Sequence, residues 1–333
     1  MSGSTTSAAA RAASAGAGGR LGDWRREGLR TAGILIPFLI LFAVLSLASE
    51  SFFTATNFEN ILDQQSGILI MAAAGTLVLV AGGIDLSVGA VYALAGVTSA
   101  KIAEQGHPVL AIVVGVAVGI AVGGVNGVVA TYLRINALIA TLAMSFVIGG
   151  IASLITKGNL VVLFDHPEFG DFARTEILGM RSSIWIMLVA VLIFGVVLSR
   201  ATIGRYMYAS GGNADAARLA GVRVYWTRIV AFMFSGGAAA LAGVLDASRV
   251  LSAQAGGSQT LAFTVLAGIV VGGTSILGGE GAVWRTVVGV LFLALVGNGY
   301  QLLGLDPLYE QITLGALMLL AVGVDAWWRQ RQG

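Results

Sequence analysis

Long apolar stretches recur along the chain and are separated by shorter polar or glycine-rich segments. A stretch of about 17–25 apolar residues can cross a bilayer as a helix, and about ten stretches approach that length. The pattern therefore predicts an all-α integral membrane protein with about ten transmembrane helices in one domain over residues 31–328. The stretches cover residues 31–49, 62–81, 86–103, 108–131, 135–156, 183–199, 226–247, 260–278, 284–304 and 309–328.

The third and eighth stretches each contain or adjoin a glycine pair, Gly82-Gly83 and Gly272-Gly273. Glycine permits backbone conformations that break a helix. The sequence is therefore compatible with continuous, broken or re-entrant helices at these two places.

The basic residues predict the orientation, because cytoplasmic loops of membrane proteins carry an excess of Lys and Arg. With a cytoplasmic N-terminus, 14 of the 19 basic residues fall on the inside. We therefore expect both termini to be cytoplasmic, with a disordered basic tail over 1–30 and a short tail over 329–333. Of the two long loops, 200–225 is then cytoplasmic and 157–182 lies outside.

Composition agrees with a lipid-facing surface. Hydrophobic residues make up 57% of the chain and charged residues only 11%, against about 25% charged residues in soluble domains. The 47 glycines suit helices that approach closely within a bilayer. The net charge is only +2, and the basic residues are distributed over several loops. We therefore expect membrane lipid and no nucleic acid as a partner.

Enzymatic chemistry has little support in the sequence. Cysteine is absent, and the two histidines, His107 and His166, both fall in predicted outside loops. Asp85 and Asp246 fall at opposite predicted faces, too far apart to act as a carboxylate dyad. We therefore predict no catalytic residue, no cofactor-binding residue and no metal site in this chain.

The predicted spans hold almost no charge, which bears on the energy source. Asp63, Asp246, Glu310 and Asp325 all lie near span ends, and Arg249 follows Asp246 at a spacing that predicts a local ion pair. Ion-coupled transporters usually carry acidic residues or histidine in mid-span. An ion-coupled secondary transporter is therefore the weaker alternative, and a partner that supplies the energy is favoured.

The predicted inside loop contains a short helix with signals at both ends. Asn213 suits the N-cap, Asp215 complements the positive helix end, and Gly221 suits the left-handed residue after the helix. Arg218 follows Asp215 by three residues and can pair with it. Two turns of helix are unstable alone in water, so this helix packs either on its own bundle or on a cytoplasmic partner.

A second candidate segment begins the third span. Its glycines, Gly82, Gly83 and Gly89, flank Asp85 and Ser87, whose side chains can accept hydrogen bonds from free backbone N–H groups. The segment is therefore predicted to break the helix, with Asp85 and Ser87 holding the inner end of the third span.

Four ordered motifs resemble the ribose/xylose/arabinose-type permeases of bacterial ABC importers. The resemblance covers about residues 33–325 and implies a type II ABC importer-like permease in the bacterial inner, or plasma, membrane. Family members pair as dimers, bind ABC ATPase subunits inside and receive substrate from an extracytoplasmic sugar-binding protein. The motifs are Gly82-Gly83-Ile84-Asp85-Leu86-Ser87-Val88-Gly89, Gly211-Gly212-Asn213 through Gly221, Val271-Gly272-Gly273 through Gly281, and Gly297-Asn298-Gly299 with Leu302-Leu303-Gly304.

The resemblance implies that the short inside helix docks on the ATPase. Its residues would be Asn213, Asp215, Ala216, Ala217, Arg218, Leu219 and Gly221. Leu219 and the alanines are expected to form the apolar face that enters the ATPase. ATP and Mg²⁺ would be used by that partner chain, and the second permease copy would be the same chain or a paralogue.

The resemblance also implies a monosaccharide substrate, which means a pentose, a hexose or a related polyol. A neutral polyol needs hydroxyl and amide groups along its pathway, for which Asn126, Asn298 and Gln301 are candidates. A permease for a nucleoside or a branched-chain amino acid remains the alternative.

Overall fold

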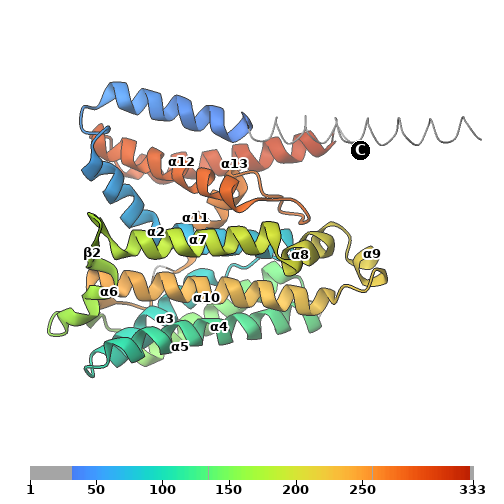
Figure 1. Cartoon of the computed structure of the whole chain (residues 1–333), viewed down its shortest axis with the longest axis horizontal. Coiled ribbons are helices and arrows are strands. Elements are labelled where there is room, and N and C mark those ends of the chain that lie inside the picture. Colours follow the sequence, from blue (N-terminus) through green and yellow to red (C-terminus); the bar gives the residue numbers. More distant parts are fainter. Residues whose placement is uncertain (1–31, 134, 257, 331–333) are drawn as a thin grey trace, which may run out of the picture.

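The computed structural model describes residues 32–133, 135–256 and 258–330, and most of these residues belong to helices aligned with one long axis (Figure 1). The predicted tail over 1–30 and residues 331–333 lie outside the described residues. The helices are Ala32–Ala48, α2 (Ala55–Val80), α3 (Val88–Ala103), α4 (Pro108–Tyr132), α5 (Ala137–Thr156), α6 (Asp171–Arg174), α7 (Ser182–Arg200), α8 (Thr202–Gly212), α9 (Ala214–Leu219), α10 (Val224–Val250), α11 (Ser258–Val271), α12 (Val283–Leu302) and α13 (Leu308–Gln330).

Each predicted apolar stretch contains a helix. Among the described residues, six helices are long and apolar enough to cross a membrane, namely α2, α4, α5, α7, α10 and α12. The apolar helices Ala32–Ala48, α3, α11 and the first part of α13 are shorter. The helical membrane-protein prediction is thus confirmed, while the number of crossings stays a prediction.

The two helices beside the glycine pairs, α3 and α11, are short. They have 16 and 14 residues, or about 24 and 21 Å at 1.5 Å per residue, against about 30 Å for a bilayer core. Non-helical loops over 81–87 and 272–282 extend them to the end of the bundle where α9 lies, here called the α9 end. Such backbone is tolerated at membrane depth where protein buries it. Ala81, Leu86 and Thr274 are buried, whereas Leu277, further along the second loop, is 73% exposed.

Helix α10 is central to the bundle and packs against α2, α3 and α4. Its contact with α4 is close because glycines face each other. A Cβ atom on Gly123 of α4 would lie 2.3 Å from the carbonyl oxygen of Phe232, and one on Gly236 would lie 2.2 Å from that of Gly119. Dispersion contacts between closely packed backbones are the attraction that remains available in lipid.

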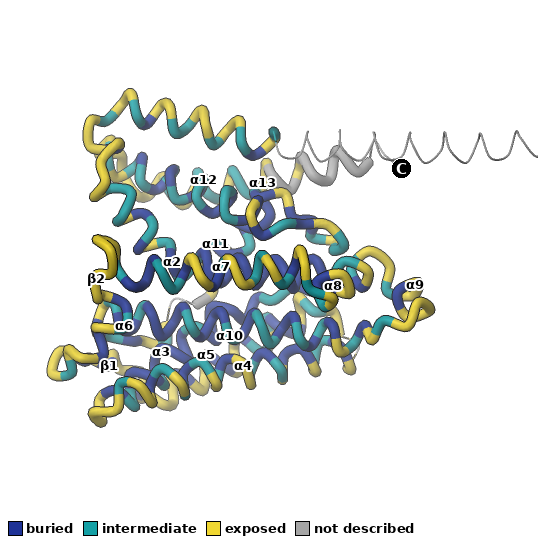
Figure 2. The backbone as a smooth tube through the Cα atoms, viewed as in Figure 1, coloured by how far each residue is buried: buried dark blue, intermediate teal, exposed yellow. Residues whose placement is uncertain are grey.

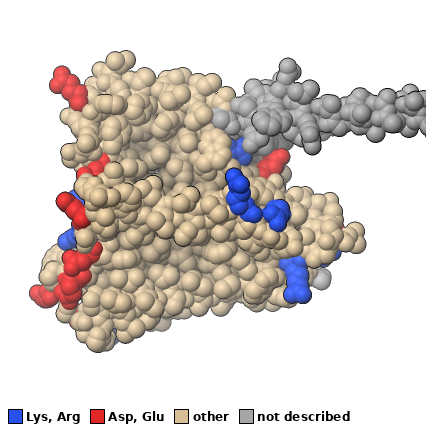
Figure 3. Space-filling model, viewed as in Figure 1, with Lys and Arg blue, Asp and Glu red and all other residues tan. Residues whose placement is uncertain are grey.

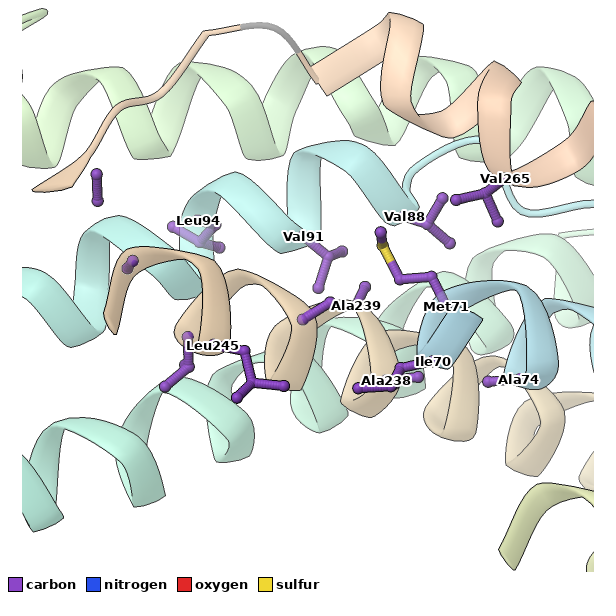
Figure 4. Packing of buried hydrophobic residues seen from close by; sticks show 14 of the residues in the cluster. Ile70, Met71, Ala74, Val88, Val91, Leu94, Ala238, Ala239, Leu245 and Val265 are labelled. Atoms are coloured by element: carbon purple, nitrogen blue, oxygen red, sulfur yellow. The ribbon is translucent and has the colours of Figure 1, made fainter. Parts of the chain in front are cut away.

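Small and branched apolar side chains fill the space between α2, α3, α10 and α11 (Figure 4). Met71, Val91, Ala239 and Val265 come from these four helices and belong to one buried cluster. At the periphery the pattern is reversed, since Leu154, Phe146 and other apolar side chains of α4, α5 and α7 are exposed (Figure 2). An apolar exposed surface of this kind suits contact with lipid.

The end opposite α9 is here called the α6 end and carries the loop over 157–182. The loop contains η1 (Pro167–Gly170) and α6, and its strand β1 (Val161–Val162) pairs antiparallel with β4 (Ser252–Ala253) after α10. Strands β2 (Glu176–Ile177) and β3 (Met180–Arg181) form a second pair.

The two ends differ in charge. On the face shown in Figure 3, acidic side chains gather at the α6 end, whereas most basic side chains lie near α8 and α9. This is the asymmetry on which the predicted orientation depends.

Candidate functional site

Three of the four sequence motifs meet at the α9 end. The loop over 81–87, the last residues of α8 and the loop over 272–282 touch through their backbones, and the Gly279 N–H donates to the Val80 carbonyl at 2.9 Å. We call this contact the glycine junction and define it by Gly82, Gly211, Gly278 and Gly279. It links the helix that leads into α9 directly to the two short helices of the core.

Glycine is required in the glycine junction for two reasons. Gly82, Gly278 and Gly279 have φ angles of 80°, 90° and 74°, in the left-handed region that other residues rarely adopt. Gly211 leaves no room for a side chain, because its Cβ would lie 1.9 Å from the Val80 carbonyl oxygen and 2.6 Å from the Gly279 nitrogen.

Two side chains fasten the glycine junction to neighbouring helices. The Tyr208 hydroxyl of α8 donates to the Gly281 carbonyl at 2.7 Å, and Nε of Arg228 in α10 donates to the Ala81 carbonyl at 3.1 Å. Both bonds use backbone carbonyls that the loops leave unpaired. The first bond therefore ties α8 to the loop over 272–282, and the second ties α10 to the loop over 81–87.

The N-terminus of α9 is capped as predicted. The Asn213 side chain accepts from the backbone N–H groups of Asp215 and Ala216 at 3.1 and 3.0 Å. The predicted ion pair is also present, with Nη2 of Arg218 2.6 Å from the Asp215 carboxylate. These local bonds hold a six-residue helix that could not persist alone.

The C-terminus of α9 is a Schellman motif. Gly221 has a φ of 86°, its N–H donates to the Arg218 carbonyl, and the N–H of Val222 donates to the Ala217 carbonyl, both at 2.9 Å. The left-handed glycine is thus where the sequence predicted it.

The apolar face of α9 differs from the expected one. Ala217 is 5% exposed and faces its own chain, whereas Leu219 is 91% exposed. Ala216 and Ala220 are exposed as well. The apolar residues available to a partner are therefore Ala216, Leu219 and Ala220, beside the exposed Asp215–Arg218 pair, and Ala217 belongs to the packing of α9 on the bundle.

The Asp85 carboxylate lies just before α3 and accepts three hydrogen bonds. Its donors are the backbone N–H and the hydroxyl of Ser87, at 3.0 and 2.5 Å, and the hydroxyl of Ser235 in α10, at 2.7 Å. Ser87 is the N-cap residue of α3, but its side chain makes no capping bond. The expected hold on the start of α3 is therefore present, with Asp85 rather than Ser87 as the acceptor.

Asn126 of α4 extends this cluster. Its Nδ2 donates to the Ser87 hydroxyl at 2.7 Å. Because a carboxylate can only accept, Ser87 must give its own proton to Asp85 and accept from Asn126, which fixes the orientation of the amide. The Asn126 Oδ1 atom is buried and has no partner among the described residues.

The chain matches a family described as the permease component of branched-chain amino acid transport systems over residues 57–322. The ribose import permease protein of Escherichia coli K12 is 38% identical over 295 residues, which cover 87% of this chain and 92% of that protein. The chain belongs to this permease family.

Two L-arabinose permeases are also similar in sequence along most of the chain. The L-arabinose ABC transporter permease protein of Azospirillum brasilense is 35% identical over 328 residues, 98% of this chain and 96% of that protein. The L-arabinose transport system permease protein of Escherichia coli K12 is 37% identical over 301 residues, 89% and 90% of the two chains. No solved structure matches the chain.

The Asp85 cluster leads to the first testable prediction. Replacing Asp85 by alanine should lower the yield of folded permease, because three donors would lose their acceptor at about 1–3 kcal/mol for each buried group. Asp85→Asn, which keeps one acceptor oxygen, should recover part of the yield. The amount of monodisperse permease recovered after extraction in detergent measures the yield of both variants. An alanine variant made in normal amounts but with altered substrate selectivity would identify Asp85 as a ligand contact instead.

The candidate pathway residues are not brought together. Asn126 lies near the start of α3, towards the α9 end. Asn298 lies near the C-terminus of α12, at the other end of the bundle from Asn126. Its side-chain amide donates to Asn57 Oδ1 at 2.9 Å and accepts from Asn57 Nδ2 at 3.2 Å. Gln301 is exposed. Within the described ranges, no group of three or more His, Asp or Glu side chains could hold a metal ion.

A polar cluster near the α6 end was not predicted as a site. The predicted Asp246–Arg249 pair is present, and Arg249 Nη1 also donates to the Asp63 backbone carbonyl at 2.9 Å. Arg181 lies 2.6 Å from the Asp63 carboxylate, which is buried. The only sequence signal was the three-residue spacing of Asp246 and Arg249, since Asp63 and Arg181 are 118 residues apart.

Proposed function

We propose that this permease is the membrane subunit of an ATP-driven ABC importer that carries a monosaccharide. The observation that carries the proposal is the similarity to ribose and arabinose permeases at 35–38% identity over 87–98% of the chain. An extracytoplasmic binding protein would deliver the sugar to the α6 end.

The substrate could instead be a branched-chain amino acid, as the description of the family suggests. The relatives named above carry ribose or arabinose by name and cover nearly all of the chain. They support a pentose or a related polyol more strongly than the general description of the family supports an amino acid.

Helix α9 is the proposed docking helix for the ATPase. It projects from the end of the bundle (Figure 1), and its Leu219 side chain is 91% exposed. The glycine junction would pass movements of the docked ATPase to α3 and α11. ATP and Mg²⁺ would be bound by that partner, so the energy for transport would come from outside this chain.

The proposed membrane arrangement has ten crossings in the bacterial inner membrane, with both termini and α9 in the cytoplasm. The four shorter apolar helices would complete the ten crossings, and two permease chains would pair. The greater number of basic side chains near α8 and α9 supports this orientation (Figure 3).

The orientation gives a second prediction. The chain has no cysteine, so single cysteines can replace Glu176 and Ala216, which are exposed at the two ends of the bundle. A membrane-impermeant thiol reagent added to intact cells should label the Glu176→Cys variant only. Inverted membrane vesicles should show the opposite pattern, and labelling of both variants from one side would contradict the arrangement.

The substrate class can be tested by uptake into proteoliposomes that hold the permease with its ATPase, using the genetically adjacent binding protein. Labelled ribose, arabinose and xylose should be taken up in the presence of ATP, and labelled leucine should not. Uptake of leucine without uptake of a sugar would show that the amino acid alternative is correct.

A further inference from the structure

A cavity of about 190 Å³ lies between α2, α3, α7, α10 and α11, near the α6 end. Its polar lining includes Gln64, Tyr92, Asp246 and Arg249, and its apolar lining includes Met71 and Leu245. None of the sequence motifs contains these residues. The cavity is also separate from the glycine junction, which lies at the other end of the bundle.

The charged groups around the cavity compensate one another. The Asp246 carboxylate accepts from the Tyr92 hydroxyl through one oxygen and from Arg249 through the other. Next to this pair, the Asp63 carboxylate is bound by Arg181 and by the hydroxyl of Ser183. The charged side chains of the lining, Asp246 and Arg249, therefore cancel, and the Asp63–Arg181 pair next to the cavity is also balanced. A cavity with no formal net charge disfavours a charged ligand.

The lining still has hydrogen-bonding capacity for a ligand. One Asp246 oxygen accepts from Tyr92 and the other from Arg249, and each can accept a second hydrogen bond. The Arg249 guanidinium has five N–H groups, more than these contacts use. The Gln64 amide, which is exposed, can both donate and accept. This combination of carboxylate, guanidinium and amide groups matches the hydroxyls of a polyol, while Met71 and Leu245 can contact its C–H faces.

The size and position of the cavity fit the same ligand. Sites for drug-sized molecules measure about 300–1,000 Å³, so a cavity of about 190 Å³ suits something smaller, such as one monosaccharide. The cavity lies in the half of the bundle near the loop over 157–182, from which a delivered substrate would enter.

We propose that this cavity binds a single neutral monosaccharide during transport, with Gln64, Asp246 and Arg249 as its hydrogen-bonding contacts. The proposal rests on the proposed function and adds to it the residues that hold the sugar. Arg249 lines the cavity and is held by Asp246 and by the Asp63 carbonyl, so its guanidinium would need little reorganisation to bind a ligand there.

The Gln64→Cys variant tests the site directly, with Glu104→Cys as the matched control. Glu104 is exposed at the same end of the bundle but does not line the cavity. A small impermeant methanethiosulfonate reagent should lower ATP-driven pentose uptake by the Gln64→Cys variant about tenfold or more, and a reducing agent should restore it. Excess pentose should slow labelling of the Gln64→Cys variant but not of the control. Equal labelling rates with and without pentose, or unchanged uptake after labelling, would overturn the proposal.

Asp246→Asn gives an independent measurement, with Glu104→Gln as its control. Both replaced residues belong to ion pairs with a three-residue spacing at the same end of the bundle. The Asp246 variant should bind the ATPase normally and lose about tenfold in pentose uptake, equivalent to about 1.4 kcal/mol. If the Asp246→Asn variant does not fold, the Gln64→Cys experiment still tests whether the cavity binds the sugar. Absence of uptake of any pentose, hexose or related polyol by the unmodified permease would reject the proposed function. Normal pentose uptake by both the reagent-treated Gln64→Cys variant and the Asp246→Asn variant would reject only this site.

Discussion

Replacing Gly211 by alanine is expected to prevent the permease from reaching a stable folded state. The new Cβ would lie 1.9 Å from the Val80 carbonyl oxygen and 2.6 Å from the Gly279 nitrogen. Both contacts are with backbone, so no side chain can turn aside to make room. Inserting extra atoms into a packed core costs about 1–3 kcal/mol and occasionally more, and this position should lie at the upper end.

Gly212→Ala is the matched control, because a Cβ there would meet nothing within 4 Å. Thermal unfolding in detergent and pentose uptake should be nearly unchanged for this variant. A Gly211→Ala protein that adjusts enough to fold should hydrolyse ATP with its partner but transport poorly, since α8 would no longer fit against the two loops. Normal stability and transport at Gly211→Ala would show that the glycine junction is looser than described.

Replacing Leu219 by aspartate is expected to detach the ATPase without disturbing the membrane domain. Leu219 is 91% exposed, so the change removes no packing within the permease. At the centre of an interface, loss of a key side chain costs about 2 kcal/mol or more, equivalent to about 30-fold weaker binding. Pull-down of the ATPase from solubilised membranes measures the effect, and ATP-driven uptake should fall with it.

Leu178→Asp is a matched control for this change. Leu178 is 86% exposed, but it lies in the loop over 157–182 at the other end. This variant should bind the ATPase like the unmodified permease. Ala217→Trp would be a poor substitute for Leu219→Asp, because Ala217 is buried and a tryptophan there would disturb the packing of α9 itself. If the Leu219 variant binds the ATPase normally, α9 is not the docking helix.

Features set by short stretches of sequence could be predicted. The helical apolar stretches, the Asn213 cap, the left-handed Gly221 and the Asp215–Arg218 pair all depend on residues a few positions apart. The break before α3 was also visible in its glycines. Each of these follows from local backbone chemistry or from the energy of transferring apolar residues into lipid.

Features that join distant segments could not be predicted. The sequence does not show that Gly211 touches both Val80 and Gly279, or that Ala217 rather than Leu219 faces the bundle. The cavity is a further case, because Gln64 and Asp246 come from α2 and α10. Their meeting depends on how the helices pack, which the helical periodicity of each segment leaves undetermined.

The most direct test of the account concerns the source of energy for transport. Proteoliposomes containing the permease, with or without its ATPase, would receive internal ATP, a proton gradient or a sodium gradient, and a pentose-loaded binding protein outside. The account predicts pentose uptake only when both ATP and the ATPase are present, with either gradient having no effect. Gradient-driven uptake by the permease without its ATPase would contradict it.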